Sequence, residues 1–237
     1  MNVSNTKQAE LTAKDILYED NHLIIINKKP GQIVQGDKTG DTPLSELVKI
    51  FLKKKYNKPG NVFCGVIHRL DRPASGIVIF AKTSKALSRM NTLIKDREIR
   101  KFYWAVVEKR PEKMEDRLEN YLQKIEAKNK SFVVAKNKNK ALLAQLDYKM
   151  LSSSDNYSLL EIHLITGRHH QIRVQLSHIK CPIKGDVKYG SKRANKDASI
   201  HLHARKIQFT HPVSKEEISI TANPPNENLW NFFAANN

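Results

Sequence analysis

A carboxylate, Asp71, lies between two arginines in the stretch His68-Arg69-Leu70-Asp71-Arg72. Turn-forming residues follow at Pro73 and Ser75-Gly76, and an apolar, β-branched run begins at Ile77. This order predicts that Asp71 lies on a polar loop that leads into a buried strand. Neighbouring cations lower the pKa of a carboxyl group, and an ionised carboxylate suits a nucleophile better than a general acid. The same residues are also compatible with a structural ion pair in a turn.

A second polar segment, Thr166 to Arg173, joins an expected strand to an expected helix through Gly167. We expect this helix to cover residues 168–180, which places Arg168 at its start. A planar guanidinium there can bind a carboxylate or a phosphate in a bidentate manner, and the backbone N–H groups of a helix start also favour anions. An exposed arginine at a helix cap, without a ligand, remains the alternative.

An aromatic segment, Lys101-Phe102-Tyr103-Trp104-Ala105-Val106, lies inside an expected long strand over residues 99–107. A tyrosine can stack its ring on a nucleic-acid base and form a hydrogen bond through its hydroxyl. Aromatic residues in strands more often belong to the core, so this pattern alone gives Tyr103 no functional assignment.

The elements that must position these residues follow from the apolar periodicity. Strands are expected at about 16–19, 23–27, 77–81, 99–107, 157–166, 200–209 and 217–221, and helices at about 43–55, 84–94, 168–180 and 224–233. Strands with irregularly interspersed helices indicate an α+β fold with a mixed, largely antiparallel sheet. We expect residues 1–14 to form a flexible N-terminal tail and residues 15–237 a single domain.

The chain has 41 Lys and Arg against 24 Asp and Glu, and its net charge of +17 favours a polyanionic partner such as nucleic acid. A solvated, lysine-rich surface is the alternative. Cys64 and Cys181 are too few for a disulfide framework, and no His or carboxylate spacing indicates a metal site. No segment has the character of a signal peptide or a membrane span, so we expect a cytoplasmic protein with no membrane, metal or cofactor partner.

Several segments together resemble the RluA family of RNA pseudouridine synthases. They are HRLD at 68–71 followed by Ser75-Gly76, TGRxHQIR at 166–173, PIxGDxxYG at 182–190, HLHA at 201–204, KxYxAxV from Lys101, and NKPxGxxV from Asn27. The resemblance runs from about Ile16 to Pro224. The sequence departs from the family pattern at Lys29 (Pro), His169 (Thr or Ser) and Lys180 (Gly). The resemblance implies the pseudouridine synthase fold, a sheet in two lobes with flanking helices and a central cleft.

The resemblance also implies a reaction, the isomerisation of specific uridines in rRNA or tRNA. Asp71 would act on the sugar, either by attack at the anomeric carbon or by removing the proton of the neighbouring carbon. Arg168 would pair with Asp71 and keep it ionised, and Tyr103 would stack on the base. The residues expected to bind RNA are Arg69, which would fill the space left by the flipped nucleotide, and Arg72, Lys82, His170 and Arg173.

Many family members carry a small RNA-binding domain before the catalytic one. Here only about fifteen residues precede the first expected strand, so we expect the catalytic domain alone. A monomer is the default expectation. Substrate choice would then rest on its basic surface, including the stretch 124–140. Two alternatives stay open: a non-catalytic RNA-binding or ribosome-assembly protein on the same scaffold, and a hydrolase that releases the base, although glycosidic hydrolases usually use two carboxylates.

Overall fold

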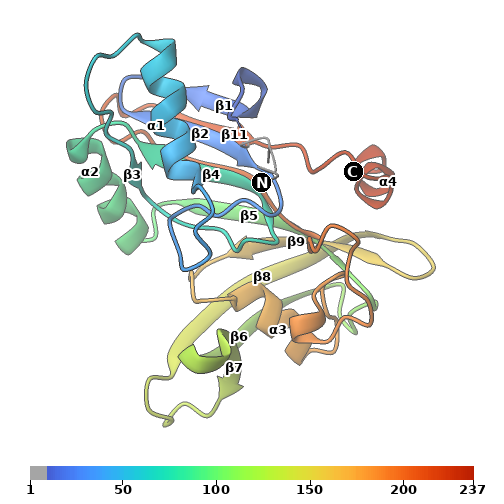
Figure 1. Cartoon of the computed structure of the whole chain (residues 1–237). Helices are drawn as coiled ribbons and strands as arrows, with labels where there is room; N and C mark the ends of the chain where they lie inside the picture. The colour runs from blue at the N-terminus through green and yellow to red at the C-terminus, as the bar shows by residue number, and fades with distance from the viewer. Residues whose placement is uncertain (1–9) are drawn as a thin grey trace, which may run out of the picture.

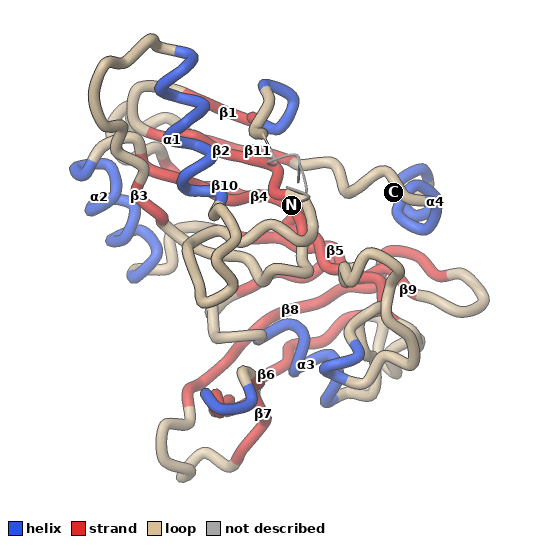
Figure 2. Tube along the Cα trace, in the orientation of Figure 1, coloured by secondary structure: helices blue, strands red, loops and turns tan. Residues whose placement is uncertain are grey.

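A computed structural model describes residues 10–237 of the chain. In this part of the chain eleven strands form one hydrogen-bonded sheet, whose main path runs β1-β2-β4-β10-β5-β9-β8-β6-β7, with β3 paired to β4 and β11 to β10 (Figures 1 and 2). The strands are β1 (Ile16–Glu19), β2 (Leu23–Lys28), β3 (Gly65–Val66), β4 (Ser75–Ala81), β5 (Arg100–Val107), β6 (Glu115–Ile125), β7 (Lys130–Val134), β8 (Leu142–Ser153), β9 (Ser158–Leu164), β10 (Leu202–Thr210) and β11 (Glu217–Thr221).

The helices are α1 (Leu44–Lys55), α2 (Ser84–Lys95), α3 (Gln171–His178) and α4 (Asn228–Ala235). All strand pairs between the named strands are antiparallel except β4 with β10, which is parallel. The expected α+β fold with a mixed, largely antiparallel sheet is therefore confirmed.

Strands β2 and β4 are apolar along their whole length and are buried on both faces. Along β2, Leu23 and Ile25 join the large core that also holds Met90 of α2, whereas Ile24 and Ile26 join a second core with Leu44 of α1. Helices α1 and α2 thus cover opposite faces of this part of the sheet. Because both faces are buried, the strands carry continuous apolar runs instead of an alternating pattern.

The contact between β4 and β10 is unusually close at Gly76. This glycine has φ +110°, and a Cβ atom added to it would lie 2.4–2.8 Å from backbone atoms of Ala204. Ala204 pairs with Gly76 on one side and with Tyr103 of β5 on the other. The register therefore brings the loop that precedes β4, which carries Asp71, to within two strand spacings of Tyr103.

The second half of the sheet consists of β5, β9, β8, β6 and β7 in that spatial order. It carries α3 and ends in a projecting β6–β7 hairpin (Figure 1). On α3, Ile172 and Leu176 pack into the large core, and Val174 packs with Leu122 of β6 and Ala144 of β8. Helix α4 packs on the other face of β5 and β9, where Trp230 contacts the cluster of Trp104 and Leu159. The two halves give the two lobes that the family resemblance implies.

Two expectations about element boundaries are wrong. Helix α3 begins at Gln171, not at 168, because His170 adopts the left-handed conformation (φ 54°, ψ 24°), which stops a helix from extending further back. The terminal helix begins at Asn228, where the Glu227 side chain accepts a hydrogen bond from the Trp230 N–H, instead of at the prolines.

The start of the chain belongs partly to the folded unit. Residues 1–9 of the expected tail lie outside the described residues. Within residues 10–14, however, Leu11 is buried in the core beside α1, and both the backbone N–H and the hydroxyl of Thr12 donate to Asp15. No helix among the described residues combines the length and the apolar character needed to cross a membrane.

Candidate active site

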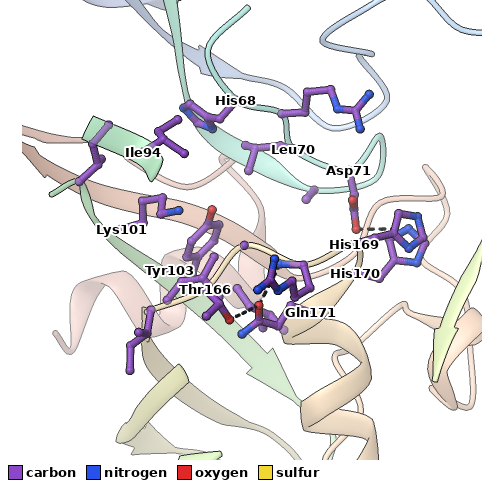
Figure 3. A pocket seen from close by; sticks show the side chains of 18 of the residues that line it. His68, Leu70, Asp71, Ile94, Lys101, Tyr103, Thr166, His169, His170 and Gln171 are labelled. Atoms are coloured by element: carbon purple, nitrogen blue, oxygen red, sulfur yellow. Dashed lines mark hydrogen bonds and ion pairs between the residues drawn. The ribbon is translucent and has the colours of Figure 1, made fainter. Parts of the chain in front are cut away.

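A pocket of about 580 Å³ lies where the loop before β4, the end of α2, the face of β5 and the loop before α3 meet (Figure 3). Its charged and polar lining is strongly basic. The ionisable side chains are Arg69, Lys95, Arg97, Lys101, Arg168, Arg173, His68, His169, His170, Tyr103 and one carboxylate, Asp71. Six of the eight site residues expected from sequence therefore line one pocket.

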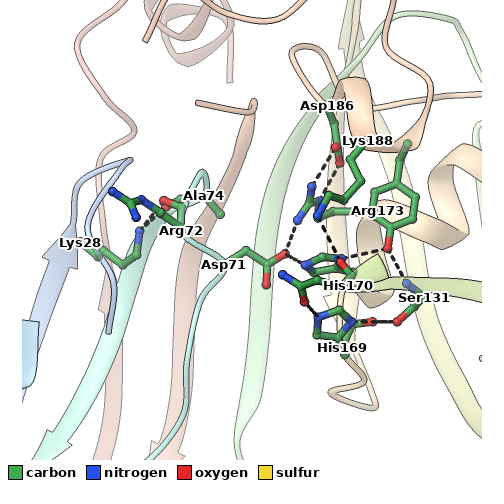
Figure 4. A network of polar contacts seen from close by, with 12 residues as sticks. Lys28, Asp71, Arg72, Ala74, Ser131, His169, His170, Arg173, Asp186 and Lys188 are labelled. Carbon is green, nitrogen blue, oxygen red and sulfur yellow. Dashed lines mark hydrogen bonds and ion pairs between the residues drawn. The ribbon is translucent and has the colours of Figure 1, made fainter. Parts of the chain in front are cut away.

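The partner of Asp71 is Arg173. Nη1 of this arginine donates to Asp71 Oδ2 at 2.8 Å, while its Nε and Nη2 donate to the two oxygens of Asp186 at 2.7 and 2.8 Å (Figure 4). Arg173 is 5% exposed and Asp186 only 1%, so the guanidinium is fixed inside the protein. Among residues 10–237 no hydrogen-bond partner is present for Asp71 Oδ1, which leaves this oxygen available to a ligand.

Asp71 is ionised at neutral pH. Burial of the carboxyl group raises its pKa, but the charge and the hydrogen bond of Arg173 oppose this effect and hold the pKa below its ordinary value. Burial lowers the pKa of His170 to about 3 despite the nearby Asp71, so this imidazole is neutral at pH 7. Arg173 is therefore the permanent positive charge that keeps Asp71 in its carboxylate form.

Tyr103 and Lys101 share one face of β5 and project into the pocket (Figure 3). Burial, and then the charge of Asp71, raise the pKa of Tyr103, so its phenol stays neutral. Burial alone lowers the pKa of Lys101. His68 is a structural residue on the opposite wall, since its Nε2 accepts a hydrogen bond from the Ile79 N–H at 3.1 Å.

The predicted pairing of Arg168 with Asp71 is wrong for this structure. Arg168 lines the pocket, but its Nε donates to the Leu143 carbonyl of β8 at 2.9 Å, and its backbone N–H donates to the side chain of Gln171. Arg168 lies in the loop before α3, three residues ahead of the first helical residue, whereas Arg173 lies in the first turn of the helix and reaches Asp71.

Two residues expected near the site lie outside the pocket. Arg72 follows Asp71 directly, but its half-exposed side chain pairs with Asp41 at 2.6 Å. Lys82 is 10% exposed and pairs with Glu19 at 2.8 Å, because it follows the far end of β4, roughly 23 Å of strand away from the Asp71 loop. Arg69 does line the pocket and is exposed, as a residue that meets RNA would be.

Buried polar residues that the sequence patterns did not single out support the Asp71 loop. The ammonium of Lys28, 1% exposed, donates to the carbonyls of Ala74, Lys29 and Arg72 at 2.6, 3.0 and 3.2 Å. Its position inside the 27–34 motif was the available signal. Asp186 likewise lies inside a family motif, at 182–190, but nothing in the sequence indicated that it would bind Arg173.

Among the described residues, no group of three or more His, Cys, Asp or Glu side chains has the arrangement of a metal site. The arrangement instead offers an ionised carboxylate with one available oxygen, a neutral tyrosine beside it, and a cationic rim. Such a site suits covalent or proton-transfer chemistry by a single carboxylate on a polyanionic ligand.

Comparisons with known proteins define the class. A family model described as RNA pseudouridylate synthase matches residues 22–178. The chain is 33% identical over 226 residues to ribosomal large subunit pseudouridine synthase C of Buchnera aphidicola subsp. Baizongia pistaciae, covering 92% of this chain and 69% of that protein. It is 29% identical over 235 residues to tRNA pseudouridine synthase C of Pectobacterium carotovorum subsp. carotovorum, covering 91% and 60%.

Among solved structures, the human RNA pseudouridylate synthase domain containing 4 superposes with a TM-score of 0.75 and 24% identity, over 90% of this chain and 89% of that chain, which shows the shared fold. The chain belongs to the RluA family of RNA pseudouridine synthases, as the sequence motifs indicated. It spans between 60% and 69% of the length of the two curated relatives named above.

Proposed function

We propose that this chain isomerises uridine in RNA to pseudouridine with Asp71 as its catalytic carboxylate. The observation that carries the proposal is the position of Asp71: among the described residues it is the one carboxylate that lines the basic pocket, ionised by the buried Arg173, with Oδ1 open to a ligand.

The reaction breaks the bond between N1 of uracil and C1′ of the ribose, turns the base, and joins C5 to C1′ with loss of the C5 proton. Two routes are open to Asp71. Its Oδ1 can attack C1′ as uracil leaves, and the ester is displaced when C5 attacks. Alternatively, Oδ1 takes the proton from C2′ as uracil leaves and returns it after the new bond has formed. Either route needs an ionised carboxylate at the start.

The target nucleotide must leave its stack to reach Asp71. Tyr103 would hold the flipped base through its ring, and a neutral phenol beside the carboxylate adds no competing charge. Arg69, at the exposed rim, would occupy the space in the RNA from which the nucleotide was taken. Flipping costs a few kcal/mol and least in a loop, so we expect an unpaired uridine as the target.

Phosphate binding would come from the cationic rim, for which Lys95, Arg97 and Arg168 are available in addition to the expected Arg69. Of the other expected residues in the pocket, Arg173 is buried and bound to Asp71 and Asp186, and His170 is neutral, so neither is proposed to bind phosphate. Lysines of the projecting β6–β7 hairpin, within the stretch 124–140, would extend this surface and select the RNA. The named relatives act on ribosomal large-subunit RNA and on tRNA, and both remain candidate substrates here. A monomeric state, a single domain and a cytoplasmic location remain predictions.

The test is incubation of the purified protein with total RNA from a strain that lacks it, followed by carbodiimide mapping of pseudouridine. We expect a new modified position with the wild type and none with Asp71→Asn, which should still bind RNA. Modification by both proteins would remove Asp71 from the mechanism. Release of free uracil would indicate a hydrolase, and RNA binding without any change in the RNA would indicate a non-catalytic binding protein.

A further inference from the structure

A second branch of the polar network around Asp71 runs through His170 to Ser131 of β7 (Figure 4). The backbone N–H of Ser131 donates to Tyr189 Oη at 2.9 Å, and Tyr189 Oη lies 2.9 Å from His170 Nδ1. His170 Nε2 in turn lies 3.6 Å from Asp71 Oδ2. A continuous polar path therefore connects the β6–β7 hairpin to the carboxylate.

The positions of the protons along this path follow from its donors. Burial raises the pKa of Tyr189, so the hydroxyl keeps its proton. Its oxygen already accepts from the Ser131 N–H, and its proton is available to His170 Nδ1. A neutral imidazole that accepts at Nδ1 carries its proton on Nε2, which is the nitrogen that faces Asp71.

The orientation of the His170 ring is restrained from two further directions. The backbone at His170 is left-handed (φ 54°), which turns this residue out of α3. The ring of His169 stacks on it with a centroid distance of 3.8 Å. His169 is itself held to the hairpin, because its Nδ1 lies 2.9 Å from Ser131 Oγ and its Nε2 3.1 Å from Asn129 Oδ1.

Both neighbours of the carboxylate face the same oxygen. Arg173 makes the direct hydrogen bond to Oδ2, and the His170 Nε2 lies at 3.6 Å from it, longer than a hydrogen bond but close enough for its N–H dipole to favour a negative charge there. The second oxygen, Oδ1, is thereby left to the pocket.

We propose that Tyr189 and His170 are positioning residues that fix an Nε2–H group toward Asp71 Oδ2 and so present Oδ1 to the sugar of the target nucleotide. This role rests on the proposed function. It also makes the seating of the β6–β7 hairpin, through Ser131, part of the alignment of the carboxylate. The chain has His169 where the family pattern has Thr or Ser, so the stacked contact to the hairpin is a feature of this sequence.

The main test compares Tyr189→Phe with Tyr148→Phe under single-turnover conditions. Both variants lack one tyrosine hydroxyl; that of Tyr148 donates to the Lys113 carbonyl at 3.1 Å, away from the pocket. We expect Tyr189→Phe to lower the rate constant about 10-fold with the RNA concentration for half-maximal rate unchanged, and the control to stay within about 2-fold. Equal rates for Tyr189→Phe and wild type would overturn the proposal, as would equal losses in both variants.

A second pair of variants distinguishes the roles of the two ring nitrogens of His170. The amide nitrogen of Gln can reach the place of Nε2, whereas Asn places its amide near Nδ1 and offers no donor to Asp71. His170→Gln should therefore retain more activity than His170→Asn, by about 5-fold or more. The reverse order would overturn the proposal.

The pH profile provides a readout that a purely structural role would not change. The charged and titratable groups that face His170 are Asp71, Arg173, His169, Lys188 and Tyr189. Without the Tyr189 hydroxyl, protonation of Nδ1 no longer costs a hydrogen bond, so the pKa of His170 rises. A hydrogen bond of about 1 kcal/mol corresponds to about one pKa unit, so the pKa rises from about 3 toward about 4. The cation of His170 pairs with Asp71, so the activity of Tyr189→Phe should fall on the acid side at a pH about one unit higher than that of the wild type. Acid limbs at the same pH would contradict the proposed proton arrangement.

Imidazole ¹⁵N NMR tests the arrangement without activity. At neutral pH we expect the Nε2–H tautomer of His170 in the wild type and a mixture of the two neutral tautomers in Tyr189→Phe. A wild-type Nδ1–H tautomer would overturn the inference. If the wild type modifies no RNA but shows the expected tautomer, the proposed function has failed and the positioning network has not.

Discussion

Replacement of Arg173 by Lys tests the central feature of the site, since the structure assigns the pairing with Asp71 to Arg173 and not to Arg168. Lysine keeps the positive charge but has no planar fork, so it cannot bind Asp186 and Asp71 together. A hydrogen bond to a charged group contributes about 1.5–3 kcal/mol. Because about 1.4 kcal/mol corresponds to a tenfold change in rate, removal of the Nη1 hydrogen bond predicts a single-turnover rate about 10- to 150-fold lower.

The matched control is Arg168→Lys, an identical substitution in the same pocket. This variant lacks the hydrogen bond to the Leu143 carbonyl but leaves Asp71 and its partner untouched. We expect its single-turnover rate within about 3-fold of the wild type, with weaker RNA binding as the larger effect. The assay is release of tritium from RNA labelled at C5 of uridine, since C5 must lose its hydrogen in the reaction.

The free energy of unfolding should also distinguish Arg173 from Arg168. Arg173→Met leaves the carboxylate of Asp186, 1% exposed, without its cation, and removal of one partner from a buried ion pair costs about 3–5 kcal/mol. Urea unfolding should show this decrease in stability for Arg173→Met and less than about 1 kcal/mol for Arg168→Met. If Arg168→Lys instead slows the reaction as much as Arg173→Lys, and both proteins fold, the assignment of Arg173 as the partner of Asp71 is refuted.

Three further predictions concern the scaffold and the RNA surface. Gly76→Ala should destabilise the fold by about 3 kcal/mol or more in urea unfolding, because its Cβ would overlap the backbone of Ala204; a decrease below about 1 kcal/mol would contradict this. Burial opposes ionisation of Glu19, but hydrogen bonds from Lys55, Lys82 and Tyr56 lower its pKa to about 2. The stability that Lys82 contributes through Glu19 is therefore present above pH 4.5 and is lost as the pH falls toward 2. Lys82→Met should thus be about 1 kcal/mol less stable at pH 7 and show a smaller deficit near pH 2, where only the hydrogen bond of Lys82 to the Asp20 carbonyl is still lost; an equal deficit at both pH values would contradict the role of the Glu19 ion pair. Glutamine in place of the lysines within 124–140 should weaken RNA binding and make the salt dependence shallower by about one in slope for each phosphate that is no longer neutralised, and unchanged binding at physiological salt would exclude this surface.

Local patterns predicted the elements of this fold better than their ends. Continuous apolar runs predicted β2 and β4, and the helix expected at about 84–94 is present as α2, where the Thr83 hydroxyl accepts a hydrogen bond from the Ala86 N–H. The start of α3 could not be predicted in this way. His170 is held in a left-handed conformation by tertiary contacts to Tyr189 and Asp71, and no propensity of the residue itself indicates that outcome.

The pocket was predictable as a set of motifs, but the contacts inside it were not. Asp71 and Arg173 are 102 residues apart, and the sequence offers several arginines of equal chemical suitability. The choice between Arg168 and Arg173 depends on tertiary contacts: the Leu143 carbonyl of β8 binds Arg168, and Asp186 holds Arg173 beside Asp71. Lys82 illustrates the same point: adjacency to a predicted active-site strand says nothing about which end of that strand carries the residue.

A second carboxylate, that of Asp186, explains why the residue that binds Asp71 is an arginine. Asp186 occupies Nε and Nη2 of Arg173, which leaves Nη1 as the group that meets Asp71 Oδ2. A guanidinium fixed at two of its nitrogens cannot turn to bind both oxygens of Asp71, so it supplies charge to one oxygen and leaves the other free. Asp186 would by itself disfavour a second nearby carboxylate, but the shared cation lies between the two and stays charged at every pH at which the protein folds. Asp71 is thus both ionised and only partly coordinated, and its proposed role at the sugar requires both properties.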